Sequence, residues 1–191
     1  MSSSLTRPHL GALILLALVL AAAKPAADPV GALFAFEPAD VQLRTRAWQT
    51  PKAKSESAEA LALELAEDET FVLTLEEGTE LSGSWTRKSP SSSRISLTLD
   101  AAGEDALRAH LGQRVADQLL PPFAQTGPAD LELTKLRLKL RLVTDKATGD
   151  LWAKLVLRVR AKGGLQPAGP DALPLKTAWK IVGTSVPVTQ G

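Results

Sequence analysis

The sequence predicts a mainly β (or α+β) protein, an antiparallel sheet or barrel of about six to eight strands with one amphipathic helix near residues 101–120. Apolar and polar residues alternate most clearly over 136–142 and 151–159, and this is the period of a strand with one buried side. Residues 107–119 instead repeat Leu or Val every fourth position, as an amphipathic helix does. The chain has 191 residues, 45% of them apolar, which is enough for one core.

The first segment has the features of a secretory signal peptide. Residues 10–23 form an uncharged apolar run that stops at Lys24 and Pro25. This run is shorter than the stretch of about 20 residues that spans a membrane, and it ends in small Ala residues that a signal peptidase accepts. We expect a signal peptide at 1–23, cleaved after Ala23, and a secreted or periplasmic protein.

Domain boundaries follow from composition. Residues 24–40 carry three Pro and no period, so we expect an extended N-terminal arm, with Leu33, Phe34 and Phe36 available for docking. The remaining residues, 41–191, are expected to form a single β-rich domain.

Period-two alternation marks the strands of the first half. The expected strands are 41–48, 70–75, 81–87 and 94–99. Residues 55–69 are ambiguous, because Ala, Glu and Leu favour a helix whereas Leu61, Leu63 and Leu65 alternate. The alternation continues into 71–75, which favours a strand for the second half of the segment.

One helix is expected to follow. Asp100 is suited to cap its start, and Pro121 and Pro122 end it. His110 lies next to the apolar stripe, where we expect a partly exposed side chain.

A long hairpin comes next, over 136–142 and 151–159, with a last short strand at 175–182. Leu131 and Leu133 have the opposite parity to Leu136 and the residues after it. This shift predicts a bulge near Thr134 and Lys135.

A short motif adds a family resemblance. Gly83-Ser84-Trp85, within residues 80–100, is similar to the Gly-x-Trp near the first strand of lipocalin-like barrels, and the surrounding residues resemble meander strands of bacterial lipocalin-like domains. In this chain the Trp lies mid-sequence and the helix precedes the last long hairpin. The resemblance implies a lipocalin-like barrel; an open sheet is also compatible with the pattern.

Composition restricts the chemistry. The chain has no Cys, and His110 is its only histidine beyond the leader, so we expect no disulfide, metal site, cofactor or catalytic residues. Seven acidic residues between 64 and 80 lack the spacing of a calcium loop, and we expect a solvated surface there.

Charge is distributed unevenly. Residues 24–130 hold 17 acidic and 10 basic residues, whereas 131–191 hold 4 and 11. Six cations should share the outward side of the long hairpin: Arg137, Lys139, Arg141, Lys154, Arg158 and Arg160. They could cover a solvated sheet, pair with the acidic strands of the chain, or contact an anionic polymer or lipid head groups.

These observations favour an exported, non-catalytic protein that binds an apolar or amphiphilic ligand, such as a lipid, or an envelope component. The expected ligand site lies between sheet and helix: Leu107, Leu111 and Val115 line it, and Trp85 and Trp152 lie near its mouth. The alternative is a structural or adhesive module that contacts an anionic envelope polymer or lipid head groups through the basic hairpin. Nucleic acid is not an expected partner, because the mature chain has no net charge.

Overall fold

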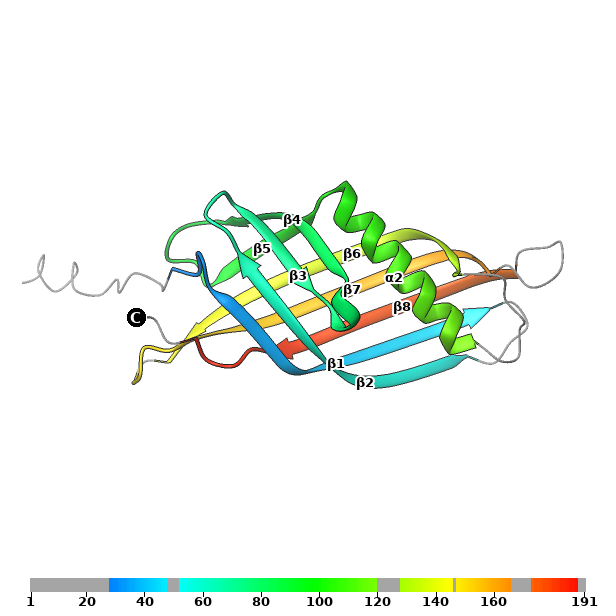
Figure 1. The fold of residues 1–191 in the computed structure, drawn as a ribbon, viewed down its shortest axis with the longest axis horizontal. Coiled ribbons are helices and arrows are strands. Elements are labelled where there is room, and N and C mark those ends of the chain that lie inside the picture. Colours follow the sequence, from blue (N-terminus) through cyan, green and yellow to red (C-terminus); the bar gives the residue numbers. More distant parts are fainter. Residues whose placement is uncertain (1–27, 48–51, 120–127, 146, 166–172, 189–191) are drawn as a thin grey trace, which may run out of the picture.

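The computed structural model describes residues 28–47, 52–119, 128–145, 147–165 and 173–188. Within them, eight antiparallel strands form a closed barrel in chain order, which is one of the two architectures compatible with the sequence pattern (Figure 1). The strands are β1 (Leu33–Ala47), β2 (Ala53–Leu65), β3 (Thr70–Thr74), β4 (Glu80–Arg87), β5 (Arg94–Leu99), β6 (Asp130–Thr144), β7 (Leu151–Leu165) and β8 (Leu173–Thr184). A short 3-10 helix, η1 (Glu76–Gly78), joins β3 to β4, and the helix α2 (Ala101–Leu119) joins β5 to β6.

The wall of the barrel is made of strands of unequal length. β3 and β5 have 5 and 6 residues, whereas β6 and β7 have 15 each. Strand β5 pairs with β6 over Arg94–Ser96. Helix α2 packs against β2, β4, β5 and β6, and in Figure 1 it lies beside the short strands, over the long ones. The helix therefore closes the side of the barrel that the short strands leave open.

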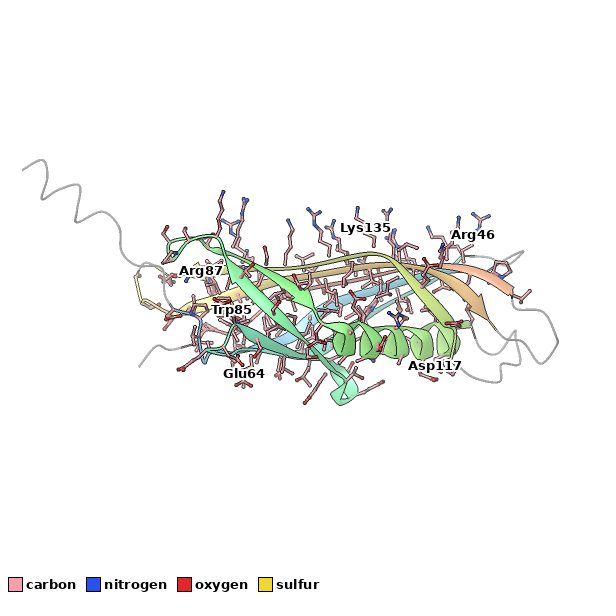
Figure 2. All side chains as sticks on the ribbon, turned by 90° about the horizontal axis from the view of Figure 1, so that it is seen from above. Arg46, Glu64, Trp85, Arg87, Asp117 and Lys135 are labelled. Atoms are coloured by element: carbon pink, nitrogen blue, oxygen red, sulfur yellow. The ribbon has the colours of Figure 1, made fainter. Side chains whose placement is uncertain are left out.

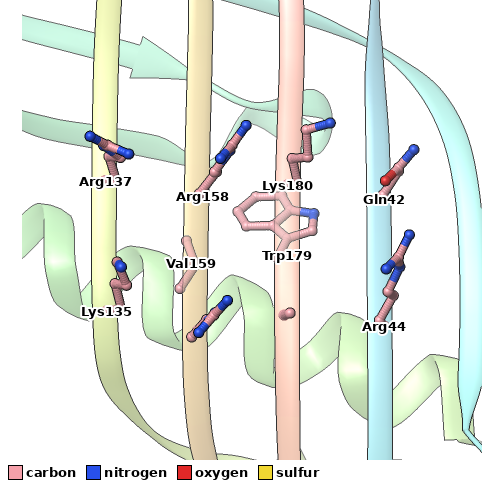
Figure 3. A pocket seen from close by; sticks show the side chains of 10 residues that line it. Gln42, Arg44, Lys135, Arg137, Arg158, Val159, Trp179 and Lys180 are labelled. Carbon is pink, nitrogen blue, oxygen red and sulfur yellow. The ribbon is translucent and has the colours of Figure 1, made fainter.

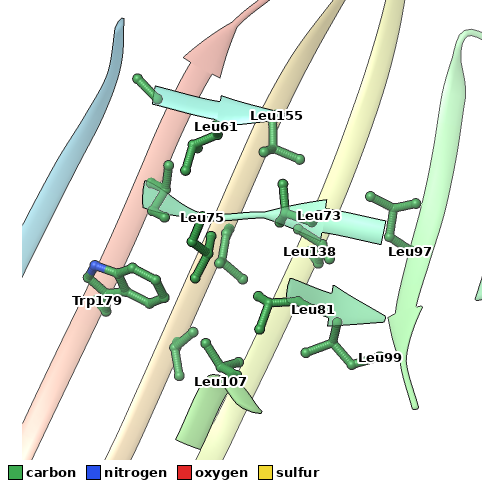
Figure 4. Close-up of a cluster of buried hydrophobic side chains, with 14 of the residues drawn as sticks. Leu61, Leu73, Leu75, Leu81, Leu97, Leu99, Leu107, Leu138, Leu155 and Trp179 are labelled. Carbon is green, nitrogen blue, oxygen red and sulfur yellow. The ribbon is translucent and has the colours of Figure 1, made fainter. Parts of the chain in front are cut away.

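The interior is packed with aliphatic side chains. Inward positions of all eight strands contribute to one core, together with the apolar stripe of α2. Figure 4 shows leucines from β2, β3, β4, β5 and α2 meeting those of β6 and β7, with Trp179 at one side. Each fully buried Leu stabilises the fold by about 1.5–3 kcal/mol relative to an exposed one.

The start of α2 is fixed by a close contact with β4. Asp100 caps the helix as predicted, because its Oδ1 accepts a hydrogen bond from the Gly103 N–H at 2.7 Å. The Ser82 hydroxyl donates to the same carboxylate at 2.9 Å. A Cβ on Gly103 would lie 2.2 Å from the Ser82 carbonyl oxygen, so glycine permits this approach.

Several local predictions are confirmed. The ambiguous segment 55–69 contributes to strand β2. The strands expected at 70–75 and 81–87 correspond to β3 and β4, and the register of the β6–β7 pair shifts between Leu133 and Lys135.

Two local expectations differ from the structure. Strand β1 begins at Leu33, inside the segment expected to be an arm, and Phe34 and Phe36 are buried in the core. The register shifts between Phe36 and Ala39, which reverses the parity of the inward residues and hides the alternation in the sequence. His110 is buried, at 7% exposure, instead of partly exposed. The expected leader, 1–23, lies outside the described residues.

Candidate functional site

The outer side of the β6–β7 hairpin carries the six predicted cations. All six side chains are exposed. The register sets Arg137 opposite Arg158 and Arg141 opposite Lys154. Lys139 lies opposite Val156, and Arg160 lies opposite a further cation, Lys135. Like charges therefore face one another across the two strands.

Closure of the barrel extends this surface over two more strands. Strand β8 pairs with β7 and also with β1, so the outward residues of β8 and β1 continue the rows of the hairpin. We call the resulting surface the cationic face. It consists of Arg44, Arg46, Lys135, Arg137, Lys139, Arg141, Lys154, Arg158, Arg160, Lys162, Lys176 and Lys180.

Two rows form the centre of the cationic face. One runs from Arg137 through Arg158 and Lys180 to Gln42, and the next from Lys135 through Arg160 and Ala178 to Arg44. Figure 3 shows labelled members of both rows side by side on the four strands. Adjacent strands lie about 4.8 Å apart, so the cations form a dense array.

Few cations of the cationic face have a carboxylate partner among the described residues. Among the described residues, Lys162 is the one member of the cationic face in an ion pair, with Glu132 at 3.0 Å. Lys54, beside the face, pairs with Glu56 at 2.7 Å. A hydrogen bond from Lys54 and the charges of Lys54 and Arg44 hold the pKa of Glu56 below its ordinary value.

The acidic cluster of residues 64–80 lies elsewhere on the surface (Figure 2). The seven carboxylates between 64 and 80 are all exposed. Figure 2 shows nitrogen-tipped side chains along the edge that carries Arg46 and Lys135, with Glu64 and Asp117 on the opposite side. No group of His, Asp and Glu side chains in the described part of the chain is arranged to hold a metal ion.

Four of the five residues expected to bind a ligand belong to the hydrophobic core, and the fifth, Trp152, lies outside it. Leu107, Leu111 and Val115 have no exposed surface and belong to the core. Trp85 is buried, and its indole N–H donates to the Ala66 carbonyl oxygen at 3.1 Å. Trp152 alternates with the buried residues of β7, lies opposite Val143, and therefore faces outward.

A group of buried polar side chains, which sequence reasoning missed, lies where α2 meets the barrel. Arg114 of α2 donates to Glu59 of β2, whose side chain is fully buried. The ring of His110 lies 5.5 Å from that of Trp179. Burial lowers the pKa of His110, and Arg114 lowers it further, although Glu77 and Glu59 oppose this.

One side-chain hydroxyl of the described residues reaches the imidazole of this group. Nδ1 of His110 lies 3.2 Å from the Thr79 hydroxyl, and within the described residues no serine hydroxyl hydrogen-bonds to the imidazole. Access is also restricted, because Trp179 is 1% exposed.

Comparison of the chain with protein-family models, with curated proteins and with solved structures finds no match to any of them. Among the described helices, none has the length and apolar character needed to cross a membrane.

Proposed function

We propose that the protein is a non-catalytic module that binds polyanionic surfaces outside the cytoplasm through its cationic face. The observation that carries the proposal is the run of like charges across four neighbouring strands, most of which have no carboxylate partner among the described residues. Like charges directly opposite one another destabilise a sheet. A bound polyanion would remove this repulsion and so stabilise the folded protein.

The uneven distribution of charge also supports oriented binding to a surface rather than nonspecific adsorption. The acidic cluster of residues 64–80 lies away from the cationic face (Figure 2), so the molecule has a preferred orientation in the field of an anionic surface. The expected partners share repeated phosphate, sulfate or carboxylate groups, on an envelope polymer or on lipid head groups. The proposed compartment rests on the predicted signal peptide, and detection of a processed chain in an exported fraction tests it.

Retention on an immobilised sulfated polysaccharide tests the proposal. The variant Arg137→Ser, Lys139→Ser and Arg158→Ser removes three charges from the cationic face. The matched control Ala101→Glu, Ala102→Glu and Ala109→Glu lowers the net charge equally at exposed positions of α2. We expect the serine variant to elute at much lower salt than the wild type, because screened charge pairs weaken steeply with ionic strength.

The control should elute close to the wild type. Equal shifts in both variants would show that net charge alone governs retention, and no shift in the serine variant would rule out the cationic face.

A ligand held between sheet and helix is the second candidate. Its support is that Trp179 Nε1 and His110 Nε2 are buried without a hydrogen-bond partner among the described residues, and a polar ligand group could satisfy them. The packed leucines of α2 leave this candidate less support than the cationic face. Lipid that co-purifies with the native protein, detected by mass spectrometry, would favour it, and a lipid-free spectrum would count against it.

A further inference from the structure

Ala178 is the small residue at the middle of the cationic face. It points outward from β8, between Arg160 of β7 and Arg44 of β1 in the strand register. Lys176 and Lys180 lie two positions before and after it on the same side of the strand. Given strand spacings of about 4.8 Å and a rise of about 3.3 Å per residue, all four cationic residues have their Cα atoms within about 7 Å of Ala178.

The surface is hollowed at this point. One groove of about 370 Å³ is lined by Arg44, Lys135, Arg137, Arg158, Arg160 and Lys180, with Ala178 among its lining residues. A second, of about 500 Å³, adjoins it and is lined by Arg46, Lys52, Lys162 and Lys176. Both grooves share Arg44, Arg160 and Ala178, so the methyl group of Ala178 lies where they meet.

We propose that this hollow, which we call the Ala178 cradle, binds a single phosphate group, either free or on a larger molecule. The inference rests on the proposed function and deepens it, because it names the chemical group that the cationic face would recognise.

Charge and shape both support a phosphate. A guanidinium presents its donors in a planar fork that matches phosphate oxygens, and the cradle has one on each side. Lys176 and Lys180 add positive charge along the strand, which suits a group with more than one negative charge. The amide of Gln42, a further lining residue of the first groove, is an additional donor. A large side chain at position 178 would occupy the space that the phosphate needs.

The test fills the cradle without changing any charge. Ala178→Leu keeps every cation, and Val182→Leu is its control, since Val182 is also half-buried and outward on β8 but lies between Val156 and Asp40. Titration with inorganic phosphate, followed by phosphorus NMR, measures binding to the cradle. Retention on the sulfated polysaccharide is measured in parallel, and it reports the proposed function separately.

We expect Ala178→Leu to weaken phosphate binding at least about tenfold, which is a typical loss for a few charge-assisted hydrogen bonds, with retention nearly unchanged and Val182→Leu like the wild type. If the Ala178→Leu variant binds phosphate as tightly as the wild type, the cradle is wrong and the proposed function still stands. The cradle is also wrong if the wild type is retained on the polymer yet binds neither inorganic phosphate nor vesicles of a phosphate-bearing lipid. Both proposals are wrong if the wild type neither binds phosphate nor is retained on the polysaccharide.

A second variant and a second probe complete the test. Arg44→Gln with Arg160→Gln removes the two guanidinium groups and should abolish phosphate binding, so it decides the matter if Ala178→Leu fails to fold. Vesicles of phosphatidic acid in phosphatidylcholine identify the source of the phosphate, because phosphatidic acid carries a phosphate monoester. A loss of vesicle binding in Ala178→Leu would assign the cradle to a lipid head group, whereas a loss of inorganic phosphate binding alone would assign it to a free phosphate.

Discussion

Arg158 shows how a single residue can favour binding at the expense of stability. The register places it between Arg137 and Lys180, so its charge is repelled from both sides. Arg158→Glu turns two repulsive pairs into attractive ones. Because each cross-strand charge pair contributes about 0.2–1 kcal/mol, we expect the free energy of unfolding to rise by about 0.5–2 kcal/mol in denaturant titrations.

The same variant should bind the polyanion more weakly, and this opposition between stability and binding is what the proposed function requires. Lys88→Glu is its control, since Lys88 is exposed and lies outside the cationic face, and it should change stability little. A less stable Arg158→Glu protein would show that Arg158 has a structural role on the sheet.

His110 makes stability depend on pH. Burial and Arg114 lower its pKa in the folded state, so the unfolded chain takes up a proton at higher pH than the folded one. The stabilising contribution of the neutral ring is therefore complete above the unfolded pKa of about 6.5, and it is lost as the pH falls from there through the folded pKa. We expect the free energy of unfolding to decrease between about pH 7.5 and 5.5, and this decrease to be smaller in His110→Gln.

Carboxylates with lowered pKa values, including Asp68 and Asp100, titrate at lower pH and stay outside this window. An identical pH dependence in the wild type and in His110→Gln would refute the account of His110.

The ion pair between the half-buried Arg114 and the buried Glu59 joins α2 to β2. Arg114→Met would leave the Glu59 carboxylate buried with the Ser57 hydroxyl as a donor at 2.9 Å, and we expect a loss of about 3 kcal/mol in unfolding free energy. The double variant Glu59→Leu and Arg114→Met should recover most of that loss, because no charge is then left buried. A double-mutant cycle measured by chemical denaturation checks this, and additive effects would contradict it.

At the scale of the element, α2 depends on its contact with β4. Gly103→Ala improves helix propensity by about 1 kcal/mol, yet the new methyl group would meet the Ser82 carbonyl oxygen. We expect a net destabilisation of about 1–3 kcal/mol, the usual cost of overpacking, measured by thermal unfolding. Ala109→Gly, at an exposed position of the same helix, should lose about 1 kcal/mol through propensity alone. A more stable Gly103→Ala protein would mean that α2 and β4 are not held this close.

Element types were largely predictable because their signals are local. The two-residue period over 136–142 and 151–159 predicted β6 and β7, and the four-residue repeat predicted α2. The start of β1 was not predictable in this way, because the register shift after Phe36 breaks the period. The burial of His110 was missed for another reason: its position next to the apolar stripe does not reveal that Trp179 of β8 lies against it.

At the scale of the whole molecule, the sequence could not reveal how far the cationic face extends. The hairpin cations were visible in the alternation of 136–142 and 151–159, but Lys176 and Lys180 join them only because β8 lies between β7 and β1. Arg44 is separated from Lys180 by most of the chain, and its place depends on closure of the barrel. The alternation in the sequence indicates that these residues face outward. It does not indicate which strands, distant in sequence, lie next to one another.

The net charge of the chain does not show how the charges are distributed over the molecule. The chain has 22 basic and 21 acidic residues, yet the fold gathers twelve of the basic residues on the cationic face, and the acidic cluster of residues 64–80 lies apart from them (Figure 2). Long-range attraction to an anionic surface depends on this separation more than on net charge. Our central claim is therefore that the dense array of cations on β6, β7, β8 and β1 is the surface that binds polyanions.

NMR mapping of the bound surface tests that claim most directly. A short, soluble sulfated oligosaccharide is titrated into the isotope-labelled protein, and the amide shifts are followed at low and at high salt. We expect perturbations concentrated on β6, β7, β8 and β1, largest around Arg158, Arg160 and Ala178, which disappear at high salt. Perturbations centred on α2, β3 or β4, or none at any ratio of oligosaccharide to protein, would contradict this claim.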